Sequence, residues 1–358
     1  RRVLFRSKKF NETVAVNNVS CVFKAGTLTT LLGPSGCGKT TSLRLIAGLE
    51  RASSGKILID NEDVTLLPAT DRDVSMVFQS YALFPHMSVI ENVSYGLKMA
   101  KVNKNEYIEK SIETLKLVNL EGYEDRMPSE LSGGQQQRVA VARAIVLEPK
   151  VLLFDEPLSN LDAKLRRQVR EDIRNIQQRL GVTTIYVTHD QEESLAISDN
   201  VIVMNKSIIA QEGKPIDLYN KPNNKFVANF IGDANIIKAE VENKKNTLYN
   251  LKLGEVNLDI NSSKNLNKSI SIALRPEKIN IDNDKKENSL SGKIISASFV
   301  GNSYQYITST SVGKIYVISN DTINNFKLDD EVFLSFNKND IKILDDYNCN
   351  FVLTFVRI

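Results

Sequence analysis

A glycine-rich segment near the start of the chain has the residue types and spacing of a phosphate-binding loop. Residues 33–40 have the sequence Gly-Pro-Ser-Gly-Cys-Gly-Lys-Thr, which fits the pattern Gly-x-x-x-x-Gly-Lys-[Ser/Thr]. In such a loop the backbone N–H groups point at phosphate oxygens, the lysine reaches the terminal phosphates and the threonine hydroxyl binds Mg²⁺. We therefore expect the nucleotide-contacting residues to be Gly33, Pro34, Ser35, Gly36, Cys37, Gly38, Lys39, Thr40 and Thr41.

An acidic pair, Asp155 and Glu156, follows the apolar run 151–154. A run that is apolar throughout is typical of a strand buried on both faces of a parallel sheet. A carboxylate at the carboxyl end of such a strand faces the ligand crevice. We expect Asp155 to hold Mg²⁺, and Glu156 to act as the general base on the water that attacks the γ-phosphate.

A second candidate anion site lies at residues 131–138, which have the sequence Leu-Ser-Gly-Gly-Gln-Gln-Gln-Arg and lead into a helical run. Backbone N–H groups, a hydroxyl and the positive end of a helix together attract anions. An ordinary N-cap role would explain Ser132, but not both glycines and the glutamines. The predicted contacts of this site are Ser132, Gly133, Gly134 and Gln135.

The elements that must position these residues have an α/β pattern. Residues 27–32 predict a short apolar strand, and residues 41–47 predict a helix that ends at Gly48, which is the context that a phosphate loop needs. Over residues 8–232, apolar strand-like runs alternate with amphipathic helical runs.

Beyond Gly232 the pattern changes to short alternating runs at 269–274, 314–319 and 331–336, which predict a small β barrel or sandwich. The polar segment 282–288 is expected to divide this β domain into two halves.

Composition limits the function further. The length of 358 residues allows two domains, and a net charge of +3 is too small to indicate binding to nucleic acid. There is no run of about eighteen apolar residues, so no bilayer span is predicted. Cys21, Cys37 and Cys349 have no metal-ligand spacing, which favours reduced thiols in a cytoplasmic protein. Because the chain opens without Met, we expect residues 1–7 to be a non-native leader.

Together these motifs resemble those of the ATP-binding cassette (ABC) family. Residues 131–135 resemble the family signature, and the other family elements occur in the family's order. Gln79 resembles the loop glutamine that senses Mg²⁺ and the nucleophile, and His189 resembles the switch histidine that contacts the γ-phosphate. The resemblance thus implies Glu156, His189 and Gln79 as catalytic residues and Thr40, Gln79 and Asp155 as Mg²⁺ ligands.

Two further residues are implied by the resemblance alone. Asp162 ends the segment 159–162, which resembles the family's dimer-contact loop, although many members have alanine where this chain has Asn160. Phe10 lies where the family places an aromatic ring against adenine, but a phenylalanine in a first strand more often belongs to the core.

The family resemblance implies that two cassettes pack head to tail. ATP on Lys39 of one copy is then covered by Ser132 and Gly134 of the other. Since the chain has one phosphate loop and one signature, a homodimer or a paired second ATPase is required.

The resemblance also implies the fold and the class of ABC protein. The fold expected is an α/β P-loop NTPase, an ABC cassette at residues 8–232 with a helical subdomain at about 80–145. A small all-β regulatory domain of the oligonucleotide-fold-like (TOBE) type is expected at residues 233–358. A kinase or GTPase would have no use for the signature, and a soluble ABC protein of translation or repair usually has two cassettes or a long coiled coil.

An importer ATPase is therefore the expected function. Its implied partners are two integral-membrane permease subunits and a periplasmic or extracellular solute-binding protein, with the chain on the cytoplasmic face of a bacterial membrane and no nucleic acid. Residues 78–88, 232–235 and 299–304 most resemble the ferric-iron type. Polyamine transport is the second alternative and phosphonate transport the third.

Overall fold

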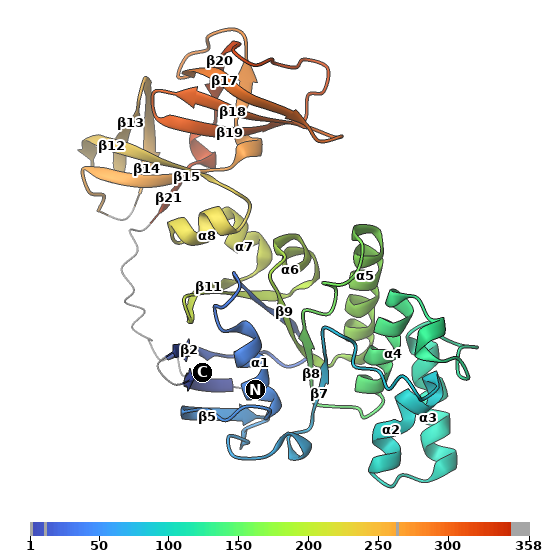
Figure 1. Cartoon of the computed structure of the whole chain (residues 1–358). Helices are drawn as coiled ribbons and strands as arrows, with labels where there is room; N and C mark the ends of the chain where they lie inside the picture. Colours follow the sequence, from blue (N-terminus) through green and yellow to red (C-terminus); the bar gives the residue numbers. More distant parts are fainter. Residues whose placement is uncertain (1–2, 11–12, 263–264, 345–358) are drawn as a thin grey trace. The chain divides into compact units, whose positions relative to one another are not determined.

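The computed structural model describes residues 3–10, 13–262 and 265–344, and they divide into a first unit, Arg1–Ile216, and a second unit, Asp217–Ile358 (Figure 1). The boundary precedes the change in composition at Gly232. It falls within the short helix α7 (Pro215–Asn220), and α8 (Lys225–Phe230) belongs to the second unit. Among the described residues, no helix combines the length and the apolar character needed to cross a bilayer.

A sheet with the strand order β11-β10-β4-β9-β8-β7 positions the candidate site, and it is parallel except for β11. Its strands are β4 (Leu28–Leu32), β7 (Val74–Val77), β8 (Val151–Asp155), β9 (Thr183–Thr188), β10 (Asn200–Asn205) and β11 (Ile208–Gly213). In β8, Leu152 and Phe154 belong to one apolar cluster, and Val151 and Leu153 belong to another. The sheet is therefore buried on both faces, which explains the uninterrupted apolar run in the sequence.

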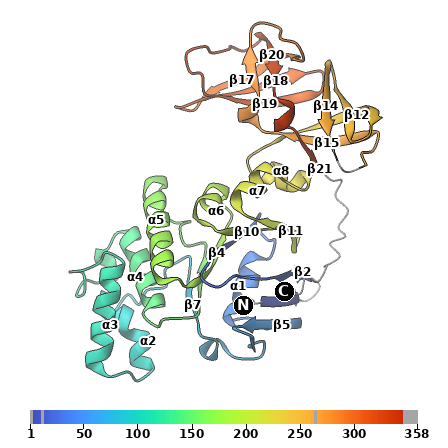
Figure 2. The same cartoon turned by 180° about the vertical axis from the view of Figure 1, so that it is seen from behind.

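Helices α4 (Gly133–Ile145), α5 (Ala163–Leu180) and, after β9, α6 (Gln191–Ile197) pack on one of these faces. Helices α2 (Val89–Met99) and α3 (Lys104–Leu117) pack on α4. Figures 1 and 2 show α2, α3 and α4 grouped together beside β7, within the range that the sequence predicts as the helical subdomain. Helix α5 buries Val169, Ile173 and Ile176, which recur at spacings of three and four residues and thus share one face.

The other face packs on α1 (Lys39–Ala47) and on an antiparallel sheet of order β2-β1-β5-β6. That sheet contains β1 (Val3–Phe10), β2 (Thr13–Asn17), β3 (Ser20–Cys21), which pairs with β1, β5 (Ser54–Ile59) and β6 (Glu62–Asp63). Residues 3–7, part of the predicted leader, lie in β1, which pairs with β2, β3 and β5. The leader itself stays a prediction.

The second unit contains two five-stranded antiparallel sheets with the orders β14-β13-β12-β15-β21 and β16-β20-β17-β18-β19. The strands of the first are β12 (Asn235–Lys245), β13 (Leu248–Leu253), β14 (Val256–Asn261), β15 (Ser269–Leu274) and β21 (Lys342–Leu344). Those of the second are β16 (Asn280–Asp282), β17 (Leu290–Phe299), β18 (Tyr304–Thr310), β19 (Gly313–Ser319) and β20 (Glu331–Ser335). Single turns of 3₁₀ helix occur at Ala69–Asp71, Pro128–Glu130, Pro276–Lys278 and Lys338–Asp340.

The β character of the second unit confirms the fold class expected from the sequence, with β15, β19 and β20 at the three predicted runs. The prediction that segment 282–288 divides the domain was wrong. β16, which precedes this segment, pairs with β20, so the segment joins two strands of the same sheet. The two sheets share one apolar core around Tyr249 and Tyr306.

Candidate functional site

Four neighbouring parallel strands end at the same edge of the central sheet, and a predicted site residue follows each of them. The loop 33–40 follows β4, His189 follows β9, Asp155 and Glu156 end and follow β8, and Gln79 lies two residues beyond β7. Because the carboxyl ends of parallel strands meet at one edge, residues far apart in sequence are brought together there. The sheet order thus builds the candidate site.

The loop 33–40 approaches other backbone segments too closely for side chains at two of its glycines. Gly38 has a φ of 98°, and a Cβ there would lie 2.3 Å from the carbonyl oxygen of Ala15. A Cβ at Gly33 would lie 2.3 Å from the carbonyl oxygen of Met204. The loop leads directly into α1, so the N–H groups of the first helical turn face the edge of the sheet.

Lys39 and Thr40 direct their side chains inward. Lys39 is 5% exposed, and its Nζ donates to the carbonyl oxygens of Gly33 at 2.8 Å and Pro34 at 3.0 Å. The Thr40 hydroxyl donates to Asp155 Oδ1 at 3.0 Å. The structure therefore brings together the hydroxyl and the carboxylate that the sequence names as Mg²⁺ ligands.

Asp155 and Glu156 differ in surroundings although they are adjacent. Burial raises the pKa of Asp155, and the hydrogen bond from Thr40 opposes this. Glu156 has a φ of 45°, and its N–H donates to the carbonyl oxygen of Val187 on β9. Its Oε2 lies 3.1 Å from Nδ1 of His189, whose side chain is 57% exposed. A carboxylate and an imidazole are thus paired at the open edge of the sheet.

The segment 132–135 has a structural role within the chain. Ser132 is the N-cap of α4, with its Oγ accepting from the N–H of Gln135 and Gln135 Oε1 accepting from the N–H of Ser132. A Cβ at Gly133 would lie 3.1 Å from Leu161, and one at Gly134 would lie 2.8 Å from Leu165.

Capping thus accounts for the serine and the first glutamine within one chain, whereas the glycines face only the ends of leucine side chains. Figures 1 and 2 show α4 on the opposite side of β7 from α1, so one chain does not bring this segment to the phosphate loop. Its role as an anion site stays a prediction.

The remaining predicted residues lie on loops near this edge or outside the description. Asn160 Nδ2 donates to the backbone oxygen of Gln79 at 3.1 Å, which ties the loop after β8 to the loop after β7. Asp162 is the N-cap of α5 and accepts from the N–H groups of Lys164 and Leu165. The backbone of Phe10 ends β1, but its side chain lies outside the described part of the structure.

Sequence reasoning missed one group of residues at this edge: Arg166, Asp190 and Glu193. Arg166 is one of several arginines on α5. It pairs with Asp190, beside His189, at 3.3 Å. Helical periodicity does not separate this arginine from its neighbours, so the sequence holds no local signal for the pair.

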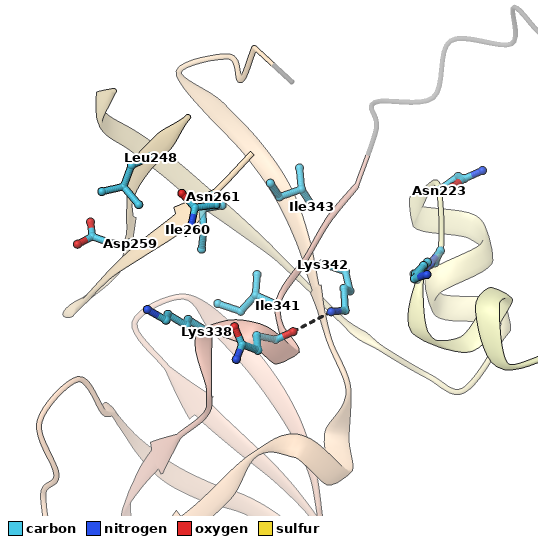
Figure 3. A pocket seen from close by; sticks show the side chains of 12 residues that line it. Asn223, Leu248, Asp259, Ile260, Asn261, Lys338, Ile341, Lys342 and Ile343 are labelled. Carbon is cyan, nitrogen blue, oxygen red and sulfur yellow. Dashed lines mark hydrogen bonds between the residues drawn. The ribbon is translucent and has the colours of Figure 1, made fainter. Parts of the chain in front are cut away.

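A separate hollow of about 470 Å³ lies wholly within the second unit (Figure 3). Lys338, Lys342 and Asp259 lie at its rim, and Ile260 and Ile341 contribute apolar surface. Lys342 Nζ donates to the backbone oxygen of Asn339 at 2.7 Å. The volume is in the range of small-ligand pockets, but its lining shows no grouping of residues for catalysis.

Comparison with protein families gives two matches. Residues 16–159 match the ABC transporter family, and residues 272–344 match the TOBE domain. The chain is 49% identical over 338 residues to the Fe(3+) ions import ATP-binding protein FbpC of Agrobacterium fabrum, covering 94% of this chain and 96% of that protein. It is 59% identical over 237 residues to FbpC 1 of Haemophilus influenzae, covering 66% of this chain and 72% of that protein.

Solved structures are similar to part of the chain. The cbiO1 subunit of the cbiONQ ABC transporter complex of Clostridium perfringens has a TM-score of 0.56 and 31% identity, over 61% of this chain and 89% of that chain. The ATP-binding cassette MJ0796, in a dimeric post-hydrolysis state bound to ADP and Pi, has a TM-score of 0.53 and 30% identity, over 60% of this chain and 98% of that chain.

Proposed function

Because the chain belongs to the ABC transporter family of ATP-binding proteins, we propose that it is the ATP-hydrolysing subunit of a binding-protein-dependent importer that carries ferric iron. The observation on which this rests is the edge of the central sheet, where Thr40 meets Asp155 and Glu156 meets His189. The cargo assignment rests on the relatives named for Fe(3+) import, which match nearly the whole chain. They favour iron over the polyamine and phosphonate alternatives.

The loop 33–40 and Thr41 bind the phosphates of ATP in this proposal. Backbone N–H groups and the ammonium of Lys39 offset phosphate charge, and this kind of electrostatic positioning supplies most of the catalysis in phosphoryl transfer. Glu156 accepts a proton from the attacking water. His189, held beside it at 3.1 Å, orients the carboxylate and contacts the γ-phosphate.

Mg²⁺ fits the oxygen donors at this site. Mg²⁺ prefers hard oxygen ligands and few protein groups, and the Thr40 hydroxyl and the Asp155 carboxylate lie within 3.0 Å of each other. We assign these two residues and Gln79 as the groups that would hold the ion. When bound, the ion neutralises charge on the phosphate oxygens.

Two copies of the chain complete the site. The ATP bound to one copy is covered by residues of the other copy, namely Ser132, Gly133, Gly134, Gln135 and Asp162. Phe10 stacks on the adenine of this ATP. This explains why a segment suited to anions lies apart from the phosphate loop within one chain. The dimeric state of the related MJ0796 cassette supports the arrangement.

The transporter partners are two permease subunits in a bacterial membrane, contacted by the helical group α2–α4 on the cytoplasmic side, and an extracytoplasmic solute-binding protein. Iron is the cargo of the assembly, and its selection belongs to the permease and the binding protein.

An uptake assay tests the cargo. The chain is produced in an Agrobacterium fabrum strain that lacks its own Fe(3+) import ATP-binding protein, and uptake of radioactive ferric iron is measured. Restored iron uptake by the parent but not by Glu156→Gln is expected. Failure to restore iron uptake, with restored spermidine uptake in a strain that lacks a polyamine import ATPase, would replace iron with polyamine.

A further inference from the structure

Arg166, on the first turn of α5, forms a bridge between two loops of the candidate site. Its guanidinium Nη2 donates to the backbone oxygen of Leu161 at 3.1 Å, and its Nη1 donates to Asp190 Oδ2 at 3.3 Å. Leu161 belongs to the segment 159–162, and Asp190 directly follows His189. We propose that Arg166 is a positioning residue that transmits the position of the segment 159–162 to His189 within the same subunit.

Asp190 is anchored firmly on the side of β9. Its Oδ1 accepts from the N–H of Glu193 at 2.9 Å, which caps α6, and its own N–H donates to the Thr188 hydroxyl at 3.0 Å. The buried carboxylate of Glu193 accepts from the hydroxyls of Tyr186 and Thr188. A displacement of Asp190 therefore moves the whole turn that holds His189.

Between the two loops there is a small hollow. Its volume is about 60 Å³, and Glu156, Ser159, Arg166 and His189 are among the residues that line it. The guanidinium of Arg166 spans this space directly. A second link runs through Glu156, whose backbone oxygen accepts from Ser159 and whose carboxylate contacts His189.

The bridge formed by Arg166 leaves one of its own hydrogen-bond donors without a partner in the described part of the chain. Nε of Arg166 is buried and has no hydrogen-bond partner in the described part of the chain. A buried donor without a partner lowers stability, and such groups call for an explanation. A role in coupling the two loops supplies one.

This inference rests on the proposed function, in which the segment 159–162 contacts the second copy of the chain. When the second copy packs on that segment, Arg166 draws Asp190, and with it His189, into the position that ATP hydrolysis requires. Hydrolysis would then follow dimer closure, because the same arginine contacts the segment that the second copy packs on and holds the turn that carries His189.

The experiment measures kcat and KM for ATP with the purified full chain and with Arg166→Gln, Asp190→Asn and the double variant. Asp190→Asn keeps an oxygen that can cap α6 but loses the ion pair. Each single variant should lower kcat by about 3- to 30-fold with KM changed less than about twofold, and the double variant should lose no more than one single variant. Arg167→Gln, an exposed neighbour on α5, is the matched control and should retain the parent kcat.

ATP-dependent dimerisation is measured in the same variants combined with Glu156→Gln, and it should persist. Equal kcat values for Arg166→Gln and Arg167→Gln, or losses that multiply in the double variant, would overturn the inference. If Arg166→Gln does not fold, the kcat of Asp190→Asn is compared with that of Arg167→Gln, and equal values would overturn the inference. A parent chain without ATPase activity would instead overturn the proposed function.

Discussion

The imidazole Nδ1 of His189 lies 3.1 Å from Oε2 of Glu156, although the two residues are 33 positions apart and follow different strands. The contact exists because β8 and β9 are adjacent and parallel, so their carboxyl ends meet. A carboxylate next to an imidazole can be oriented and used for proton transfer. This pair is the centre of the predictions that follow.

Replacing Glu156 with glutamine should reduce ATP turnover by about a hundredfold or more, because the amide cannot accept the proton of the attacking water. ATP-dependent dimers should remain, since the phosphate-binding groups are unchanged. The measurements are steady-state hydrolysis and light scattering with ATP. Glu171→Gln, an exposed acid on α5, is the control, and rapid hydrolysis by Glu156→Gln would reject the base assignment.

The two histidines of the chain provide a matched pair. His189→Ala should lower kcat by about a hundredfold, because it removes a donor beside Glu156 where charge develops. His86 is exposed, and its ring centre lies 6.2 Å from that of Phe84, so His86→Ala should keep the parent activity. Similar losses in both variants would show that histidine replacement acts through folding and not through the site.

Removal of the Thr40 hydroxyl should weaken Mg²⁺ binding. Thr40→Val should raise the Mg²⁺ concentration for half-maximal ATPase activity by about tenfold or more, because a ligand and the hydrogen bond to Asp155 are both lost. Thr40→Ser retains the hydroxyl and should behave like the parent. The test is a Mg²⁺ titration of hydrolysis, and an unchanged titration for Thr40→Val would remove Thr40 from the ligand set.

Alkylation of Cys37 should block ATP binding by bulk, because the thiol lies inside the phosphate loop and is 3% exposed. Burial raises the pKa of Cys37, and the nearby Lys39 lowers it in part. The reactive thiolate is therefore scarce at neutral pH, and modification should accelerate as the pH rises above the range of an ordinary cysteine.

Mass spectrometry of Cys37 and nucleotide titration measure the two effects, with Cys37→Ser as the unreactive control. Unchanged nucleotide affinity after complete modification would contradict the prediction.

Arg275 should stabilise the second unit. Its guanidinium donates to the backbone oxygens of Ala228 and Tyr219 and lies 4.1 Å from the Tyr219 ring centre. Arg275→Gln should lower the free energy of unfolding of this unit by about 2–4 kcal/mol, because buried acceptors lose their donors. Denaturant unfolding of the full chain measures this, with the exposed Lys285→Gln as control. Equal stability of the two variants would contradict it.

Structural features that are determined by residues close together in the chain could be predicted from the sequence. The loop 33–40 was recognisable because its glycines and its lysine act through local backbone geometry before a helix. The strand 151–155 was recognisable because burial on both faces demands a continuous apolar run. The β character after Gly232 followed from alternation with a period of two.

Relations between distant segments were decided by the tertiary structure. The residues near the polar segment 282–288 did not predict that β16 pairs with β20, because strand pairing depends on the packing of the whole sheet. Likewise, only the tertiary structure places Leu161 and Leu165 next to Gly133 and Gly134.

The sequence by itself predicted the chemistry of the site, since the types and spacing of Lys39, Thr40, Asp155, Glu156 and His189 are typical of a nucleotide-hydrolysing centre. Only the tertiary structure decided which of these residues touch, and that Arg166 joins Leu161 to Asp190. The physical reason is that such contacts depend on the order of β4, β9 and β8 in the sheet, which no pattern of neighbouring residues encodes.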